Sequence, residues 1–393
     1  MRIVFAALLI AAPACAAPVP QGAPNVPEFK PAFAGQTRAE AVVSRTPLQV
    51  TEIIAGLNKP WGVALLPDGR FLVSEKAAGV LSIVSADGTK SAPVAGTPAV
   101  DARSQGGMMG VGVPGDGWIY WSYAEPREGG NGLAVARGKL GGTAAAPALS
   151  EVSVIFRMMP TLASVQHFGG RLVFLPEGKM FVTLGDRSIL PGRVQAQDLG
   201  SHLGKIVRIN RDGSVPKDNP LVGKPGAQPE IWSWGHRNIL SAGLDAKGRL
   251  WELEHGPKGG DELNLVQKAR DHGWPTITYG EEYSGAPIGA SQTQAPGMEQ
   301  PVYYWDPVIA PSGMVVYSGK GIAEWKGNIL TGGLASKALV RLVLKNDKVV
   351  GEERLLTDRK ERIRDVIEGP AGELYLLTDD ANGKLLKVTP AAR

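Results

Sequence analysis

The residues best suited to chemistry lie between Glu230 and Gly285. This stretch combines tryptophans, the Arg237-Asn238 pair, a glycine-rich segment and several carboxylates. Glycines let backbone carbonyls converge on a cation, and a planar guanidinium group grips carboxylates in a fixed fork. The stretch therefore predicts a site that holds a metal ion beside a flat, acidic organic cofactor.

The segment from Gly256 to Glu262 offers the ligands that a hard cation prefers. Gly256-Pro257 exposes carbonyls without bulky side chains, and Asp261 and Glu262 add carboxylates. The spacing does not match an EF-hand, and the five histidines lack the paired spacing of a zinc site. A glycine-rich connecting loop with solvated acids is the alternative interpretation.

His167 is the candidate base, since it directly precedes a predicted strand and histidine can take a proton near neutral pH. A core histidine satisfied by a carbonyl is the alternative. Arg362 and Arg364 are candidate ligand-binding cations, because alternate residues on a strand point the same way. Their alternative is a surface strand with ion pairs to Asp358 or Asp365.

A repeated hairpin pattern supplies the elements that must position these residues. An apolar strand, a tight turn containing glycine and a second apolar strand recur six times, at residues 61–73, 109–121, 170–182, 242–251, 313–330 and 366–377. Asp-Gly, Glu-Gly and Lys-Gly turns suit β-hairpins, and the spacing leaves room for two more strands per unit. We expect an all-β fold, a six-bladed β-propeller of four-stranded antiparallel blades, with a two-sheet sandwich as the alternative.

Composition and charge exclude several classes of function. The chain has 393 residues, 43% of them apolar, and a net charge of +4 without a basic cluster, which argues against nucleic-acid binding. A mild positive excess instead helps attract an anionic ligand. No glycine-rich phosphate loop precedes a helix, so nucleotide chemistry is unsupported.

The first residues predict export. One positive charge, a short apolar run and Ala14-Cys15-Ala16 have the form of a signal peptide over residues 1–16, which implies a periplasmic protein. Lipid anchoring through Cys15 is the less favoured alternative. Residues 17–46 are rich in Pro and Ala and predict a tether or an irregular strap over the first strand. Residues 47–393 form the expected single propeller domain, and no later segment is apolar enough to span a membrane.

Eight short motifs occur together in one order and spacing, from about Leu57 to the C-terminus. They are Gln105-Gly106-Gly107, His167-Phe168-Gly169-Gly170, Gly204-Lys205-Ile206-Val207-Arg208, Gly235-His236-Arg237-Asn238, Glu254-His255-Gly256-Pro257, Gly260-Asp261-Glu262, Gly273-Trp274-Pro275 and Arg362-Ile363-Arg364-Asp365. Each motif is weak alone, but the ordered set resembles the PQQ-dependent soluble aldose sugar dehydrogenases, relatives of soluble glucose dehydrogenase.

The resemblance implies a propeller that holds pyrroloquinoline quinone (PQQ) over a Ca²⁺ ion at the mouth of the channel. It implies that His167 is the catalytic base, assisted by Arg237. Gly256 and Pro257 match carbonyl ligands of the cofactor-bound calcium, and Glu262 and the His272 carbonyl match a second, structural calcium site. The matched cofactor-binding positions are Gln105, Arg237, Asn238, Tyr283, Ser284, Gly285, Gly333, Leu334, Ala335, Arg362, Ile363 and Arg364.

One position departs from the family pattern. Relatives carry a cofactor-binding lysine near the position of Ala335, so either Lys337 replaces that contact or this chain lacks it.

The activity implied is oxidation of an aldose sugar at C1 to the lactone, with hydride transfer to the quinone. Electrons would then pass to an external acceptor, either a quinone or a redox protein. A calcium-dependent propeller hydrolase resembling a lactonase, and a non-catalytic propeller scaffold, are the alternatives. The preferred sugar and the oligomeric state are not indicated by the sequence.

Overall fold

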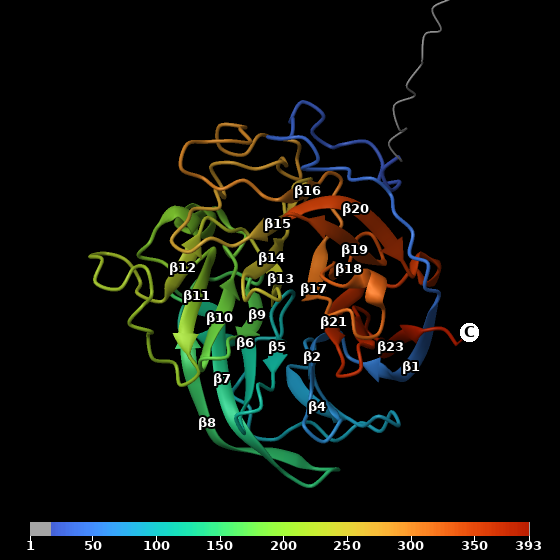
Figure 1. Ribbon diagram of the computed structural model, residues 1–393. Coiled ribbons are helices and arrows are strands. Elements are labelled where there is room, and N and C mark those ends of the chain that lie inside the picture. The colour runs from blue at the N-terminus through green and yellow to red at the C-terminus, as the bar shows by residue number, and fades with distance from the viewer. Residues whose placement is uncertain (1–16, 393) are drawn as a thin grey trace, which may run out of the picture.

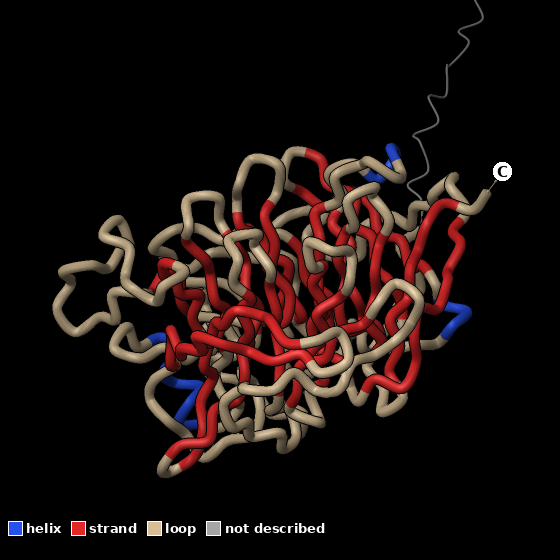
Figure 2. The backbone as a smooth tube through the Cα atoms, turned by 90° about the horizontal axis from the view of Figure 1, so that it is seen from below, coloured by secondary structure: helices blue, strands red, loops and turns tan. Residues whose placement is uncertain are grey.

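A computed structural model describes residues 17–392, in which antiparallel sheets surround a central axis (Figure 1). The all-β fold and the six-bladed propeller are confirmed. Turned by 90°, the molecule shows strands through its body and loops gathered at its two faces (Figure 2). The helical segments are short, and none among the described residues is long and apolar enough to span a membrane. They are α1 (Leu190–Arg193), η1 (Val194–Gln197), η2 (Ala323–Trp325) and η3 (Thr357–Arg359).

The innermost strands pack against one another in a closed ring around the axis. They are β2 (Pro60–Leu65), β5 (Met108–Gly112), β9 (Gly169–Phe174), β13 (Ile239–Leu244), β17 (Pro311–Val316) and β21 (Ile363–Glu368). Each pairs with the next strand along the chain, giving the six predicted hairpins. The second strands are β3 (Phe71–Glu75), β6 (Ile119–Arg127), β10 (Lys179–Leu184), β14 (Leu250–Glu254), β18 (Ile329–Gly333) and β22 (Leu374–Thr378).

The outer strands complete the blades, and five of the six blades have the predicted four strands. The third strands are β4 (Val80–Val84), β7 (Gly130–Gly142), β11 (Lys205–Asn210), β15 (Asp261–Leu265), β19 (Ala338–Lys345) and β23 (Gly383–Pro390). The outermost are β8 (Pro147–Arg157), β12 (Ile231–Trp234), β16 (Tyr303–Trp305), β20 (Lys348–Leu355) and β1 (Leu48–Leu57).

The blade β2–β4 differs from the others, because it has three strands. The chain after β4 still runs beside it, since Ser91 N donates to Ile83 O at 2.9 Å and Val94 N donates to Leu81 O at 2.8 Å. Pro93 lies between these donors and has no N–H group, which prevents a regular fourth ladder.

The ring is closed by the two ends of the described chain. β1 pairs antiparallel with β23, from Leu48 opposite Pro390 to Leu57 opposite Gly383. The last blade is thus built from both ends of the chain, which removes the open edge that a linear array of blades would leave.

The sequence predicted either a tether or an irregular strap for residues 17–46. In the structure this segment is irregular and packs against outer strands. Asn25 N donates to Asp306 Oδ1 at 2.9 Å, and Ala39 N donates to the Tyr303 hydroxyl at 2.9 Å. Ala41 forms a bridge to Glu352 on β20. The segment therefore crosses blades β13–β16 and β17–β20 (blue in Figure 1) before it enters β1. The expected signal peptide lies outside the described residues.

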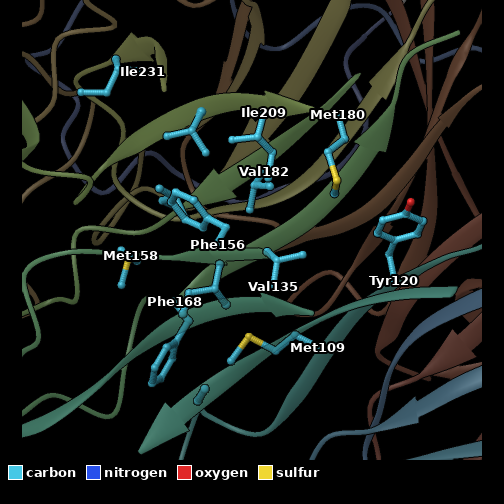
Figure 3. Packing of buried hydrophobic residues seen from close by; sticks show 14 of the residues in the cluster. Met109, Tyr120, Val135, Phe156, Met158, Phe168, Met180, Val182, Ile209 and Ile231 are labelled. Atoms are coloured by element: carbon cyan, nitrogen blue, oxygen red, sulfur yellow. The ribbon is translucent and has the colours of Figure 1, made fainter. Parts of the chain in front are cut away.

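Apolar side chains fill the space between neighbouring blades. The largest cluster joins blades β5–β8 and β9–β12, and Figure 3 shows several of its side chains, among them Tyr120, Phe156 and Met180. The Tyr120 ring also meets the Phe174 ring edge to face at 5.2 Å. Met109 and Phe168 belong to this cluster and also line a cavity on the propeller axis. The packing between blades thus fixes part of the wall of the site.

Arg171 on β9 contacts Trp61 and Leu240, two of the residues that line that cavity. Its guanidinium lies over the Trp61 ring at 4.1 Å, and its Nη1 lies 2.8 Å from Asp365 Oδ1. It also donates to the Leu240 carbonyl at 2.7 Å. This buried, paired cation therefore links several blades next to the cavity.

Candidate active site

An axial cavity of about 290 Å³ receives residues from all six blades. Its ionisable lining consists of the cations Lys59, Lys76, Arg362 and Arg364, the carboxylate of Asp379, and His255. Burial lowers the pKa of His255 to about 3, so that imidazole is neutral near pH 7. Four cations against one carboxylate suit a ligand that carries several negative charges.

A larger cavity of about 730 Å³ lies elsewhere, beside the turns of blades β2–β4 and β5–β8. Its ionisable lining residues are Asp68 and Arg70, which pair with each other at 2.6 Å. No charged group there is left for a ligand, so the axial cavity is the candidate active site.

Arg362 and Arg364 reach the cavity together, as predicted from their alternation along a strand. Arg362 Nη2 and Arg364 Nη2 lie 2.8 and 3.0 Å from Asp379 Oδ2. Arg362 also donates to the Leu334 carbonyl at 3.1 Å, while Ile363 between the arginines is buried in the apolar core. The Nε of Arg364 is buried without a hydrogen-bond partner, so this arginine has a free donor for a ligand.

His167 lies beside the cavity in a pair with Asp186. Its Nδ1 is 2.7 Å from Asp186 Oδ1, and its backbone N donates to Gln105 Oε1 at 2.9 Å. The carboxylate is held in turn by the Trp274 indole at 2.8 Å and the Ser188 N–H at 2.7 Å. Asp186 therefore fixes a proton on Nδ1 and leaves the Nε2 lone pair of His167 as the basic site.

The environment keeps His167 neutral near pH 7. Burial and, next, the Arg237 charge lower its pKa below the usual value, against the opposing effect of Asp186. Burial raises the pKa of Asp186, but His167, the Arg237 charge and the Ser188 N–H together outweigh burial, so the net shift of the Asp186 pKa is downward. The pair thus combines an uncharged base with an ionised partner.

The local backbone at His167 is unusual for a residue with a side chain. Its φ is +46°, in the left-handed region, and the neighbouring Gly169 has a φ of +72°. A Cβ on Gly185, at the end of β10, would lie 2.1 Å from the His167 carbonyl. This close approach brings Asp186, the residue after Gly185, within reach of the imidazole.

Arg237 and Asn238 directly precede β13; Asn238 lines the cavity, whereas Arg237 is buried next to it in sequence and is not among the lining residues. Arg237 Nη1 donates to the carbonyls of His255 and Gly256 at 2.9 and 2.7 Å, and its guanidinium lies 5.2 Å from the Trp274 ring. Its Nε is buried and unpartnered. Asn238 lines the cavity and accepts from Gly169 N at 3.2 Å. An acidic planar ligand would satisfy the free donor of Arg237, which fits the quinone expected from the resemblance.

The Gly256 loop fits a cation. A Cβ on Gly256 would lie 2.3 Å from the backbone of Gly259 and Gly260, so the tight fold of the loop requires glycine. The Gly256 carbonyl already faces the cation of Arg237, and a carbonyl oxygen has a second lone pair for a metal ion. No hydrogen bond among the described residues ends on the carbonyl of buried Pro257.

Glu262 and His272 lie away from the cavity, in a buried polar cluster behind Arg237. Glu262 pairs across the sheet with Glu254, and burial raises the pKa of Glu262 to about 7. The His272 ring stacks on His236 with 4.6 Å between centroids. Both ring nitrogens of His272 are buried without hydrogen-bond partners. The expected role of the His272 backbone carbonyl as a calcium ligand does not explain why these nitrogens are unpaired.

Several predicted cofactor contacts are not part of the cavity lining. Tyr283 is 74% exposed, and Ser284 and Gly285 are exposed beside it. Gly333 is buried at the end of β18, while Ala335 is exposed. The roles expected for these positions remain predictions.

Three lysines lie near the cavity and bear on the departure at Ala335. Lys337 is exposed and lines an adjoining pocket that shares Arg362 and Asp379 with the cavity, whereas Lys59 and Lys76 line the cavity itself from the first blade. Lys76 Nζ donates to the Ser104 carbonyl at 2.7 Å, and burial, followed by the Arg364 charge, lowers its pKa to about 8. Lys76 is therefore placed to supply the positive charge that relatives take from the position of Ala335.

Asp186, Lys59, Lys76 and Asp379 were missed by the sequence analysis. Lys76 directly follows β3, and Asp186 follows β10 after one intervening glycine; both strands are the second strand of a blade. The position at the end of a predicted second strand could therefore have indicated these site residues. Glu254 and His255, which belong to one of the sequence motifs, lie at the same position, at the end of β14.

Comparisons with known proteins identify the family of the chain. The sequence profile of the family described as Glucose / Sorbosone dehydrogenase matches residues 57–387. Aldose sugar dehydrogenase YliI of Escherichia coli (strain K12) is 40% identical over 341 residues, covering 85% of this chain and 91% of the relative.

Two solved structures share the whole fold. The soluble aldose sugar dehydrogenase of Escherichia coli in the apo-form is 39% identical, with a TM-score of 0.83 over 88% of this chain and 100% of that chain. The PQQ-bound form of aldose sugar dehydrogenase from Streptomyces coelicolor is 26% identical, with a TM-score of 0.71 over 88% and 99%. The chain therefore belongs to the glucose/sorbosone dehydrogenase family.

Proposed function

We propose that this protein oxidises aldose sugars at C1 to the lactone, using pyrroloquinoline quinone and Ca²⁺ in the axial cavity. The observation that carries the proposal is the placement of the buried Asp186–His167 pair beside a cavity with four cations and one carboxylate. The related proteins add weight, because the Escherichia coli relative is an aldose sugar dehydrogenase and the Streptomyces coelicolor structure is PQQ-bound.

The cofactor-binding residues divide by charge. Arg362, Arg364 and Lys76 would hold the carboxylates of the quinone, and Gln105 and Asn238 would contribute amide groups. Arg237 would contact the quinone through its unpartnered Nε. The carbonyls of Gly256 and Pro257 would bind Ca²⁺, with the remaining oxygen ligands coming from the cofactor and water.

The reaction needs a base and an electron acceptor. When bound, the quinone supplies the acceptor for the electrons and the hydrogen that leave C1. His167 Nε2 takes the proton of the C1 hydroxyl, and Asp186 Oδ1 stabilises the imidazolium that forms. Trp274 and Ser188 keep the carboxylate in place.

Electrons would leave to an external acceptor, a quinone or a redox protein. We also propose that the protein is exported to the periplasm, a proposal supported by the signal-like residues 1–16. Cell fractionation and the mass of the mature N-terminus test it. Retention of residues 1–16 in the cytoplasmic fraction would overturn it.

Reconstitution tests the proposed activity. Purified apo-protein is mixed with quinone, Ca²⁺ or both, then offered a panel of aldoses and a redox dye. We expect dye reduction and lactone formation when both additions are present, and a large loss when either is omitted. Hydrolysis of lactones with Ca²⁺ alone, without dye reduction, would instead support the hydrolase alternative.

A further inference from the structure

Trp274 orients the carboxylate that faces the base. It is 4% exposed, and its indole N–H donates to Asp186 Oδ2 at 2.8 Å, while Asp186 Oδ1 contacts His167. Hydrogen bonds weaken steeply when they are misaligned, so a tilt of the indole would weaken its hold on the carboxylate. A residue that fixes the indole therefore acts on His167 without touching the substrate.

The chain segment formed by α1 and η1 follows Asp186 in sequence and folds back on Trp274. Gln197 Nε2 donates to the Trp274 carbonyl at 2.9 Å, and Ala196 packs with the indole in a small apolar cluster. The Lys205 ammonium donates to the Ala196 carbonyl at 2.9 Å and so anchors η1. The η1 part of the segment is therefore held beside the indole, and the α1 part needs a contact of its own.

Arg193, the last residue of α1, supplies that contact. Its guanidinium lies 5.4 Å from the centre of the Trp274 ring, within the range of a cation–π interaction. The neighbouring apolar side chains are exposed, since Leu190 is 67% and Val194 56% accessible to solvent. Their packing contributes little to holding α1, so the side chain of Arg193 is the link between α1 and the indole.

The carboxylate of Glu282 fixes the position of the Arg193 guanidinium. Arg193 Nη1 pairs with Glu282 Oε1, and Arg193 Nη2 lies 3.3 Å from Glu282 Oε2, so both carboxylate oxygens are engaged. The two side chains are 17% and 29% exposed. Fully exposed ion pairs contribute little to stability, but a two-point pair between partly buried groups also sets their geometry.

Glu282 belongs to the hairpin that carries Tyr283. The preceding residue, Glu281, pairs with Lys258 at 2.6 Å and exchanges two backbone hydrogen bonds with it. Lys258 is part of the Gly256 loop, which is expected to bind calcium. Two consecutive glutamates therefore tie this hairpin to the calcium loop and to the segment that holds the indole.

We propose that Arg193 is a positioning residue, which, held by Glu282, keeps the Trp274 indole aligned with the carboxylate behind the base. The effect of Arg193 on the base runs through Asp186, and the Tyr283 hairpin is coupled to the base by the same contacts. The effect on turnover rests on the proposed function, whereas the effect on the indole does not. A plain surface ion pair is the alternative, and its loss would leave the indole hydrogen bond unchanged.

The hydrogen bond of the indole is measured by nuclear magnetic resonance, without quinone or sugar. The purified protein carries isotope-labelled tryptophan, and the indole N–H signal of Trp274 is identified by its loss in Trp274→Phe. We expect this N–H to exchange with solvent about tenfold faster in Arg193→Gln than in the wild type. Arg270→Gln is the matched control and should change nothing, because Arg270 is 59% exposed and pairs with Glu299 at 3.4 Å.

Turnover of the quinone-loaded protein shows whether the contact acts on the base. Arg193→Gln should lower kcat about tenfold and change the KM for the aldose less than about twofold, since the perturbation concerns alignment of the base. In a Trp274→Phe background, which lacks the indole N–H, the same substitution should cost less than about twofold in kcat. A residue that only stabilised the fold would not show this dependence on the indole.

Glu282→Gln provides a second variant if Arg193→Gln does not fold, and it should change the indole exchange and kcat in the same direction. An unchanged Trp274 signal in the folded variants would overturn the proposal. So would an equal loss of kcat with and without the indole N–H. A loaded wild-type protein that oxidises no aldose would refute the proposed function instead, and the exchange measurement would still decide the role of Arg193.

Discussion

Replacing Asp186 with asparagine is the most informative single perturbation of the candidate active site. The carboxylate accepts three hydrogen bonds, with Oδ1 taking His167 Nδ1 at 2.7 Å and Ser188 N at 2.7 Å, and Oδ2 taking Trp274 Nε1 at 2.8 Å. Asparagine keeps the shape but turns one of these oxygens into an N–H donor.

Either orientation of the new amide is unfavourable. An NH₂ group in place of Oδ2 faces the indole N–H of Trp274, whereas an NH₂ group in place of Oδ1 faces Ser188 N–H and forces His167 to carry its proton on Nε2. The charge that stabilises the imidazolium is lost in both cases. A charge-assisted hydrogen bond contributes up to about 3 kcal/mol. At about 1.4 kcal/mol per factor of ten, the expected fall in kcat/KM is about 100-fold.

Steady-state kinetics of the quinone-loaded protein with an aldose and a dye measure this effect, and a spectral titration checks that the quinone still binds. Asp218→Asn is the control, because Asp218 is 58% exposed and pairs with Lys179 at the surface. Full activity in folded, quinone-loaded Asp186→Asn would refute the assignment of the Asp186–His167 pair.

Three further outcomes are expected. His167→Ala should lose about 100-fold or more of its turnover while it still binds quinone, which a stopped assay checks. Because the pKa of His167 is lowered and its neutral form is the base, the wild-type kcat/KM should fall with decreasing pH only below about 6.5, which a pH profile checks. Lys76→Met should weaken quinone binding about tenfold, whereas Lys337→Met should not, and equal quinone affinities of the two variants in a spectral titration would contradict this. The quinone affinity of the wild type should also decline as the pH rises above about 8, because Lys76 then loses its charge. Gly256→Ala should cost about 1–3 kcal/mol of stability and the response to Ca²⁺, whereas Gly141→Ala, whose Cβ would meet nothing closer than 3.9 Å, should change neither in thermal melts.

The repeating hairpins made the fold predictable from sequence, because turn glycines and apolar strands are local signals. The pairing of β1 with β23 was not predictable in the same way, since it joins residues from opposite ends of the chain. The three-stranded blade follows from Pro93, a single residue whose effect depends on where the neighbouring strand runs.

The candidate site was predictable where its residues lie in recognisable motifs. Arg362, Arg364 and Asn238 reach the cavity as expected. Asp186 and Lys76 were missed, because each acts through a contact between distant parts of the chain and neither stands in a distinctive run.

The approach of His236 to Glu252 was also beyond sequence reasoning. His236 follows β12 and Glu252 lies on β14 of the next blade, so their approach depends on the packing of two blades. Motif spacing detects groups that are close in sequence, and it fails when tertiary structure brings them together.

A single-turnover experiment tests the central claim most directly. Protein loaded with Ca²⁺ and one equivalent of quinone is mixed with an aldose bearing hydrogen or deuterium at C1, without dye, and lactone is quantified beside quinone reduction. We predict one lactone per quinone, a slower reaction with deuterium, and no lactone on the same time scale from equally loaded His167→Ala. Loaded wild-type protein that forms no lactone, or a loaded His167→Ala variant that reacts at the wild-type rate, would contradict the account.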